Sequence, residues 1–246
     1  MIDDKFINFL DTLSPTGDPA LIESIRSGYL AILEATLPTK QPWADEISSI
    51  KANSKEEWAT KAYEVASKYV EGYQSVLERK LRELAPQAKI KISKKKLSSW
   101  LDKVVSRGKD ARSIRDLLRA AVLVDDPTQA EAVTERIRKD FPVYQYDYKE
   151  QGSDPEWGYH GGHHIDVVLP GDLMAEVQVM PRRLWTYKRP AHNVYTDWRS
   201  VDREGEDWAK EQERSKQLFR YGNIPKYRST DRELLNKSKM PSIEEI

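Results

Sequence analysis

The chain of 246 residues has no cysteine, no net charge and no long apolar run, and each absence excludes a class of protein. Without cysteine it has neither a disulfide framework nor a thiolate metal site, and we expect a reducing compartment, the cytoplasm. Forty basic and forty acidic residues cancel, so a polyanion must bind to a local patch. No segment approaches the length of a membrane span, and the acidic amino terminus is unlike a signal peptide. We therefore expect no membrane partner.

Helical periodicity dominates the first 86 residues. Ser54 and Glu57 have the spacing of a capping box, which predicts the start of a long amphipathic helix that Pro86 ends. Segments 2–13 and 19–36 also have helical spacing. This helical N-terminal region, residues 1–86, carries no chemical motif. We expect it to be an appendage that inhibits the protein or binds a partner.

Strands and helices alternate after Pro86. A basic stretch over 89–96 leads into a short helix that Gly108 ends, and a strand follows over 120–124. Next come a helix opened by Asp126 and Pro127, a strand over 143–148, a β-hairpin formed by 164–169 and 173–179, and a helical pattern from 181 to about 218. This order predicts an α+β domain over 87–220, a mixed β-sheet flanked by helices. A polar tail follows over 221–246.

Two carboxylates are expected to face each other across the hairpin. If three residues form its turn, the register places Asp166 opposite Glu176 on the polar face, where Gln178 also lies. Opposed like charges repel, and a divalent cation or an Arg or Lys partner would remove that cost. Asp116, just before the strand over 120–124, is either a helix cap or, with Glu176, a ligand of one Mg²⁺. The alternative for the hairpin is a solvated outer face, where water screens the repulsion.

Positive charge is concentrated around Asp116. Between residues 94 and 119 there are nine basic residues and only three acidic ones. The basic residues are Lys94, Lys95, Lys96, Lys103, Arg107, Lys109, Arg112, Arg115 and Arg119. The sequence has no glycine-rich P-loop of the Walker type, so phosphates would be held by side chains. The segment is either a polyphosphate site that uses Lys, Arg and Mg²⁺ together or a solvated charged face.

Histidine and aromatic residues gather between Trp157 and His164. Tyr159 has glycines close on both sides, and its ring is able to stack on a base; the alternative is a tight turn with a buried anchor ring. The four histidines, His160, His163, His164 and His192, raise the alternative of zinc. We disfavour it because side chains in a glycine-rich turn followed by a strand diverge, whereas zinc needs converging ligands.

Five of these segments, in this order, resemble the synthetase domain of the RelA/SpoT family. They are Ser99-Trp-Leu-Asp-Lys103, Asp116, Gly158-Tyr-His-Gly-Gly-His163, Glu176-Val-Gln-Val179 and His192-Asn-Val-Tyr195, across about residues 90 to 200. The resemblance implies a single-domain synthetase with a nucleotidyltransferase-like fold, either a small alarmone synthetase or a RelA/SpoT-like toxin.

The resemblance also implies an enzyme, a GTP diphosphokinase-like pyrophosphokinase. Its donor would be ATP, its cofactor Mg²⁺, and its acceptor the 3′-hydroxyl of a purine nucleotide, GDP or GTP or else ADP or ATP, which yields an alarmone of the (p)ppGpp or (p)ppApp type. One alternative is a growth-inhibiting toxin that pyrophosphorylates the 3′ end of tRNA and is restrained by an antitoxin or regulatory protein. Another is a catalytically inactive nucleotide-sensing module.

Site residues follow from the same resemblance. Catalytic roles are implied for Asp116, Glu176 and Gln178, with Asp116 and Glu176 as the Mg²⁺ ligands. Tyr159 matches the ring that stacks on the acceptor base. The implied nucleotide-binding residues are Lys95, Ser99, Lys103, Arg107, Lys109, Arg115, Tyr159 and His163. Two departures from the family affect nucleotide binding: Gly161 stands where the family has serine, and Ala121 stands where it has arginine.

Overall fold

The computed structural model describes residues 37–149, 154, 156–159, 161–198 and 206–223. Its backbone packing divides the chain into two compact units. The first comprises Met1–Val122, Val133–Asp147 and Ile165–Gln178, and the second comprises Leu123–Ala132, Tyr148–His164 and Val179–Ile246. The helices predicted over 2–13 and 19–36, and the tail from 224 onward, lie outside the described residues.

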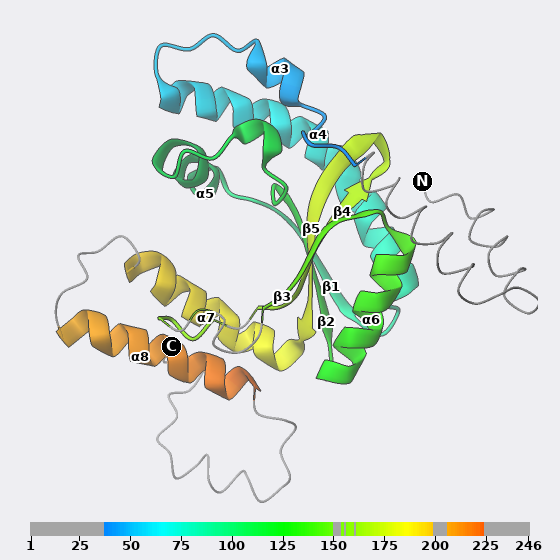
Figure 1. Ribbon diagram of the computed structural model, residues 1–246, viewed down its shortest axis with the longest axis vertical. Helices are drawn as coiled ribbons and strands as arrows, with labels where there is room; N and C mark the ends of the chain where they lie inside the picture. Colours follow the sequence, from blue (N-terminus) through cyan, green and yellow to red (C-terminus); the bar gives the residue numbers. More distant parts are fainter. Residues whose placement is uncertain (1–36, 150–153, 155, 160, 199–205, 224–246) are drawn as a thin grey trace, which may run out of the picture. The chain divides into compact units, whose positions relative to one another are not determined.

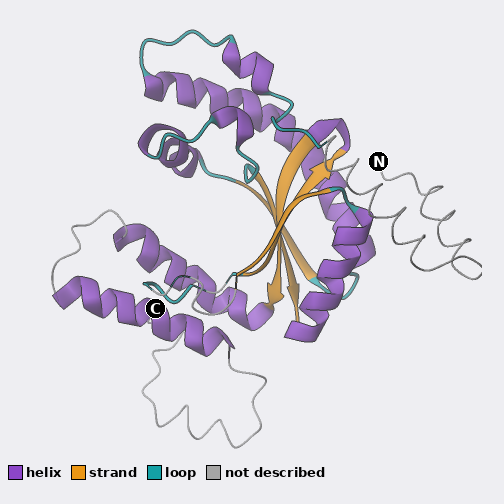
Figure 2. Cartoon of the chain, viewed as in Figure 1, coloured by secondary structure: helices purple, strands orange, loops and turns teal. Residues whose placement is uncertain are grey.

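The strands form one five-stranded mixed sheet (Figures 1 and 2). The strands lie in the order β1-β2-β5-β4-β3. Their bounds are β1 Lys89–Lys94, β2 Leu118–Val124, β3 Val143–Lys149, β4 Gly162–Leu169 and β5 Leu173–Pro181. Strands β2 and β5 are neighbours, and the contact between Arg119 and Glu176 brings the start of β2 close to the middle of β5. The predicted fold class, a mixed sheet with flanking helices, is confirmed.

The β4–β5 hairpin has the predicted turn and the predicted two faces. A short 3₁₀ turn, η3 (Pro170–Asp172), joins the strands, and Gly171 there has a φ of 73°. Ile165 and Val177 are fully buried, whereas Asp166, Glu176 and Gln178 are only partly buried. One face of the hairpin therefore lies in the core and the other carries the polar side chains.

Helix α4 (Lys55–Leu84) begins where the capping box predicts. The Ser54 side chain accepts a hydrogen bond from the Glu57 N–H, and the Glu57 carboxylate accepts one from the Asn53 N–H. The buried Trp100 of α5 (Leu97–Leu101) donates its indole N–H to the Ala59 carbonyl at 2.9 Å. This bond holds α5, and the π-helical turn η1 (Asp102–Ser106) that continues it, against α4.

Strand β1 differs from the prediction, which made this segment a basic stretch rather than a strand. In Lys89–Lys94, Ile90 and Ile92 alternate with polar residues, and Ile90 is buried. The strand lies at the edge of the sheet, where exposed lysines are common because they discourage pairing with other chains. The alternation of apolar and polar residues that predicts a strand includes only two isoleucines here, and the many lysines around them favoured the interpretation as a basic stretch.

The remaining helices are α3 (Ala44–Ser48), η2 (Ala111–Ser113), α6 (Pro127–Asp140), α7 (Arg182–Trp198) and α8 (Glu206–Asn223). The Asp126 carboxylate accepts from the Gln129 N–H at 2.9 Å, which confirms the predicted cap of α6. The predicted helical pattern from 181 to about 218 is two helices packed together (Figure 1). Across the described part of the chain, none of the helices combines the length and apolarity that a membrane crossing requires.

Buried Gln41 fixes the loop that leads into β2. Its Nε2 donates to the carbonyls of Ile114 and Met174 at 2.8 and 3.1 Å, and its Oε1 accepts from the Met174 N–H at 3.0 Å. A single side chain thus ties the residues before Asp116 to the start of β5. This connection holds the β2 end of the candidate site in place.

Candidate functional site

Asp116 lies two residues before β2 and is surrounded by cations. Its Oδ2 is 2.9 Å from Lys95 Nζ, 2.8 Å from Lys103 Nζ and 2.6 Å from Arg119 Nη2. Its other oxygen, Oδ1, is buried and accepts no hydrogen bond from any residue that the structure describes. Two of these three cations, Lys95 and Lys103, belong to the predicted nucleotide-binding set.

Separate elements bring these cations to Asp116. Lys95 follows β1, and its backbone N–H donates to the Leu117 carbonyl at 2.9 Å, which places it beside Asp116. Lys103 lies in the π-helical turn η1, whose position depends on the buried Trp100. Widened turns of this kind recur at functional sites.

The electrostatics keep Asp116 ionised. Burial alone would raise its pKa, but Arg119, Lys95 and Lys103 together hold the pKa well below its usual range. Burial, together with the neighbouring positive charge of Arg119, lowers the pKa of Lys95 to about 8, although Asp116 opposes this shift. A negative charge and several positive charges are therefore held close together with little water.

Glu176 lies on β5, the neighbour of β2, and is linked to Asp116 through Arg119. Arg119 Nε is 3.9 Å from Glu176 Oε2, while the same guanidinium contacts Asp116. Gln178 donates from Nε2 to Glu176 Oε1 at 2.8 Å. The structure thus brings Asp116, Glu176 and Gln178, the three predicted catalytic residues, into one cluster.

The carboxylate opposite Glu176 has an arginine partner. Arg115 Nη1 is 3.0 Å from Asp166 Oδ2 and donates to Gln145 Oε1 at 2.9 Å, and its guanidinium lies 4.6 Å from the centre of the Tyr144 ring. Of the two partners considered for the hairpin, the structure shows the arginine. The pKa of Asp166 is raised to about 6, chiefly by burial; Arg115 opposes this shift, and the charges of Glu176 and Asp116 favour it.

Among the predicted nucleotide-binding residues outside the salt bridges of Asp116, three lie on or just after the helical segment that carries Lys103. Ser99, Arg107 and Lys109 are all exposed. Arg107 is 4.0 Å from Asp102, and the Lys109 N–H donates to the Lys103 carbonyl at 3.0 Å. Their assignment to nucleotide binding stays a prediction.

Tyr159 belongs to the second compact unit and packs against its helices. The ring meets Phe219 of α8 edge-on at 5.5 Å between centroids, and Lys188 Nζ of α7 lies 5.3 Å from its centre. The hydroxyl is 3.3 Å from His164 Nε2. The ring is half-buried, so it has both the packing of an anchor and remaining accessible surface.

Gly161, which stands where the resembled family has serine, is closely surrounded. A Cβ at this position would lie 2.6 Å from His164 Nε2, 2.8 Å from Tyr159 Oη and 2.9 Å from Lys149 Cβ, so a larger residue would require these side chains to shift. His163, a further predicted site residue, places its ring 4.7 Å from that of Tyr148. His160 lies outside the described residues.

Arg119 is a functional candidate that the sequence analysis did not assign. It was counted among the basic residues around Asp116, but no role in the site was predicted for it. A usable signal exists: Arg119 stands two residues before Ala121 in β2, and residues two apart lie on the same face of a strand. It is therefore on the face where the resembled family places an arginine. Lys188, which lies over Tyr159, was also missed, and no motif marks it.

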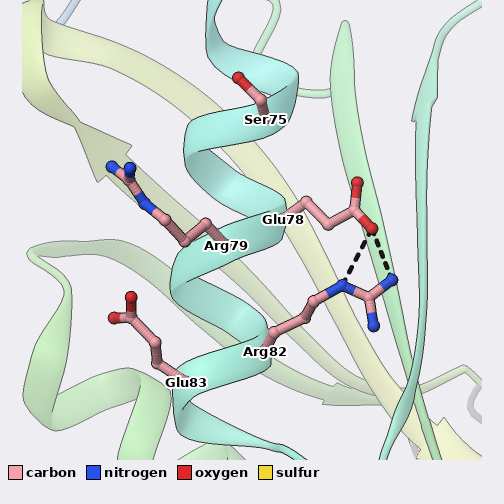
Figure 3. A pocket seen from close by; sticks show the side chains of 5 residues that line it. All are labelled: Ser75, Glu78, Arg79, Arg82 and Glu83. Carbon is pink, nitrogen blue, oxygen red and sulfur yellow. Dashed lines mark hydrogen bonds and ion pairs between the residues drawn. The ribbon is translucent and has the colours of Figure 1, made fainter.

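Helix α4 carries a surface hollow. It is lined by Ser75, Glu78, Arg79, Arg82 and Glu83, all from one helix (Figure 3). Arg82 bonds Glu78 within it at 2.6 Å, an exposed pair of the kind that surface helices often carry. None of the predicted site residues lines this hollow.

Comparison with known proteins identifies the fold. Neither family models nor curated protein sequences match the chain. Among solved structures, small alarmone synthetase 1 from Bacillus subtilis, bound to its product pppGpp, matches with a TM-score of 0.50 at 15% identity, covering 72% of this chain and 94% of that one. The chain has the synthetase fold. Small alarmone synthetase 2 from the same organism matches with a TM-score of 0.49 at 15% identity, covering 67% and 91%.

A third similar structure is the type VI effector Tas1 in complex with its immunity protein. It matches with a TM-score of 0.48 at 14% identity, covering 70% of this chain and 98% of that one. At identities this low the likeness concerns the fold alone.

The raised pKa of Asp166 predicts a specific pH dependence of stability. The folded protein binds a proton on the Asp166 carboxyl more tightly than the unfolded chain does. The stability that this proton contributes is therefore fully present below about pH 4 and is lost as the pH rises through 6. Relative to Asp166→Asn, the wild type should lose about 2 to 3 kcal/mol of unfolding free energy between pH 4 and pH 7. Denaturant unfolding at several pH values measures this difference. Asp207→Asn, which removes an exposed carboxylate of α8, is the control; parallel curves for wild type and Asp166→Asn would contradict the expectation.

Proposed function

We propose that the chain is an ATP-dependent pyrophosphokinase that transfers pyrophosphate from ATP to the 3′-hydroxyl of a purine nucleotide. The observation that supports this most strongly is the cluster around Asp116, where three cations and a second carboxylate converge in a protein with the synthetase fold. The predicted sequence segments that resemble the RelA/SpoT synthetase domain supply several members of this cluster.

The cluster around Asp116 suits a nucleoside triphosphate that binds as its Mg²⁺ complex. Lys95, Lys103 and Arg119 offer positive charge to phosphate oxygens. Mg²⁺ prefers hard oxygen ligands and usually takes only one or two carboxylates, with phosphates and water completing its shell. The buried Oδ1 of Asp116, which accepts no hydrogen bond in the described structure, and the carboxylate of Glu176 fit that requirement.

In the proposed reaction, the 3′-oxygen of the acceptor attacks the β-phosphorus of ATP. A new oxygen–phosphorus bond forms, the bond from the β-phosphorus to the oxygen bridging the α-phosphate breaks, AMP leaves and the hydroxyl proton passes to a base. Mg²⁺ would neutralise charge that develops on the phosphate oxygens. The cations around Asp116 would hold the phosphates in line, and Gln178 would orient the Glu176 carboxylate through their hydrogen bond.

The acceptor assignment rests on Tyr159. Its ring is half-buried and retains some accessible surface, and stacking on a base needs only one open face. The overall neutrality of the chain favours a free nucleotide over tRNA, because nucleic-acid binding depends largely on positive charge that meets the phosphate backbone.

A transfer assay tests the proposed function and separates its alternatives. The protein is incubated with Mg²⁺ and γ-labelled ATP, with GDP, GTP, ADP, ATP or deacylated tRNA as the acceptor. We expect label on a free purine nucleotide and equimolar release of AMP. Label on tRNA would instead support the toxin alternative. Absence of label on every acceptor, without release of AMP, would contradict the proposal and support a nucleotide-sensing module.

Glu176→Gln should abolish this transfer, because the substitution keeps the shape of the side chain but removes the charge beside the metal and phosphates. The rate should fall by roughly 100-fold or more, the size of effect seen when one electrostatic contact to a transition state is removed. The measurement is the initial rate of AMP release. Glu131→Gln, an exposed change on α6, should retain the wild-type rate. Equal rates of AMP release for Glu176→Gln and Glu131→Gln would contradict the catalytic role proposed for Glu176.

Substitutions of Tyr159 distinguish an acceptor-binding ring from an anchor ring. Tyr159→Ala should weaken acceptor binding by about 1 to 3 kcal/mol, the usual contribution of base stacking, while Tyr159→Phe keeps the ring and should lose little. The measurements are the KM for the acceptor and thermal melting of both variants, with ATP binding as the control. A pure anchor behaves differently: Tyr159→Ala would then melt far lower and lose ATP binding as well.

A further inference from the structure

Arg119 occupies the space between the two carboxylates that the proposed function assigns to Mg²⁺. Its Nη2 is 2.6 Å from Asp116 Oδ2, and its Nε is 3.9 Å from Glu176 Oε2. The same Nε donates to the Asp116 carbonyl at 2.9 Å. The guanidinium is therefore a cation that contacts both carboxylates that would hold the metal.

The charge balance of the cluster disfavours a metal ion on its own. Three carboxylates face four cations, the set being Asp116, Asp166, Glu176, Lys95, Lys103, Arg115 and Arg119. A divalent cation would add two positive charges to a group that already has an excess. A triphosphate reverses this balance, because its negative charges offset both the metal and the side chains.

Exposure and contacts together indicate which cation is able to move. The side chain of Lys95 is 6% exposed, whereas those of Lys103, Arg115 and Arg119 are 25%, 31% and 34% exposed. Of these more exposed cations, Arg119 contacts both Asp116 and Glu176. Lys95 is enclosed by its surroundings and would lose its counter-charge if it left Asp116. Arg119 lies at the solvent side of the cluster, so its long side chain is able to exchange a carboxylate for a phosphate without leaving water.

We propose that Arg119 is a placeholder cation: it neutralises Asp116 and Glu176 in the nucleotide-free protein, and it transfers to a nucleotide phosphate when Mg²⁺ enters with ATP. The inference rests on the proposed function for the identity of the metal and nucleotide. It adds an order of binding, since Mg²⁺ alone competes with Arg119 and binds weakly, whereas the Mg²⁺–ATP complex supplies a new partner for the guanidinium. Arg119 is thus a positioning residue for the carboxylates in one state and a phosphate ligand in the other.

Binding of Mn²⁺ without nucleotide tests this role directly. Electron paramagnetic resonance measures free Mn²⁺ during titration of wild type, Arg119→Gln, Arg119→Lys and Arg138→Gln. Arg119→Gln removes the charge at similar length, and we expect its affinity for Mn²⁺ to exceed that of wild type by at least about tenfold, since a unit charge a few ångströms away acts strongly at low dielectric. Arg119→Lys keeps the charge and should bind Mn²⁺ nearly as weakly as wild type.

Arg138→Gln is the matched control because it changes the net charge equally but lies on α6, paired with Glu135 outside the cluster. It should bind Mn²⁺ like wild type. A second titration, with ATP present, should show weaker ATP binding by Arg119→Gln than by wild type. The proposal is overturned if Arg119→Gln binds Mn²⁺ no more tightly than wild type or Arg138→Gln, or if no variant binds Mn²⁺ at all.

This readout is independent of catalysis. If the transfer assay yields no labelled product while Arg119→Gln gains affinity for Mn²⁺, the pyrophosphokinase proposal fails and the placeholder role of Arg119 stands. If labelled product forms but Mn²⁺ affinity does not respond to Arg119→Gln, the reaction stands and the role of Arg119 is wrong. Thermal melting of the two Arg119 variants confirms that each is folded during the titrations.

Discussion

Asp116 carries a negative charge that is largely removed from water, and such a charge persists only with positive partners close by. The sheet order satisfies this requirement by placing β1 beside β2, so that Lys95 reaches Asp116, and by placing β5 on the other side of β2, so that Arg119 reaches Glu176. The anchor of α5 on α4 brings Lys103 to the same oxygen. One buried charge thus links the edge strand, the helical layer and the central strands.

The same arrangement carries the chemistry that we propose. A cluster with several cations around two carboxylates is costly to build for stability alone, because burying each ion loses hydration. It becomes useful when a ligand completes it, and a triphosphate with a divalent cation has the complementary charges. The buried Oδ1 of Asp116, left without a hydrogen-bond donor among the described residues, is the part of the cluster that most needs such a ligand.

Local patterns were enough to predict the hairpin, its polar face and the carboxylates. Alternation places Asp166 and Glu176 on one side, and the three-residue turn sets their register. The pairing of Asp166 with Arg115, and the bridge made by Arg119, depend on how far arginine side chains reach between strands that are distant in sequence. Strand β1 was missed because two isoleucines among lysines give too short a signal. The contacts of Tyr159 with α7 and α8 are likewise non-local. The sequence therefore cannot distinguish a tyrosine that stacks on a nucleotide base from one that anchors the packing of the helices.

We propose that Asp116 and its cations form a site for ATP together with Mg²⁺. Calorimetric titration of ATP into wild type and Asp116→Asn, each with and without Mg²⁺, measures this most directly. We expect Mg²⁺ to tighten ATP binding to wild type, and we expect Asp116→Asn to bind ATP without Mg²⁺ at least as well as wild type but to gain nothing when Mg²⁺ is added. An equal gain from Mg²⁺ in both proteins, with both folded, would contradict it.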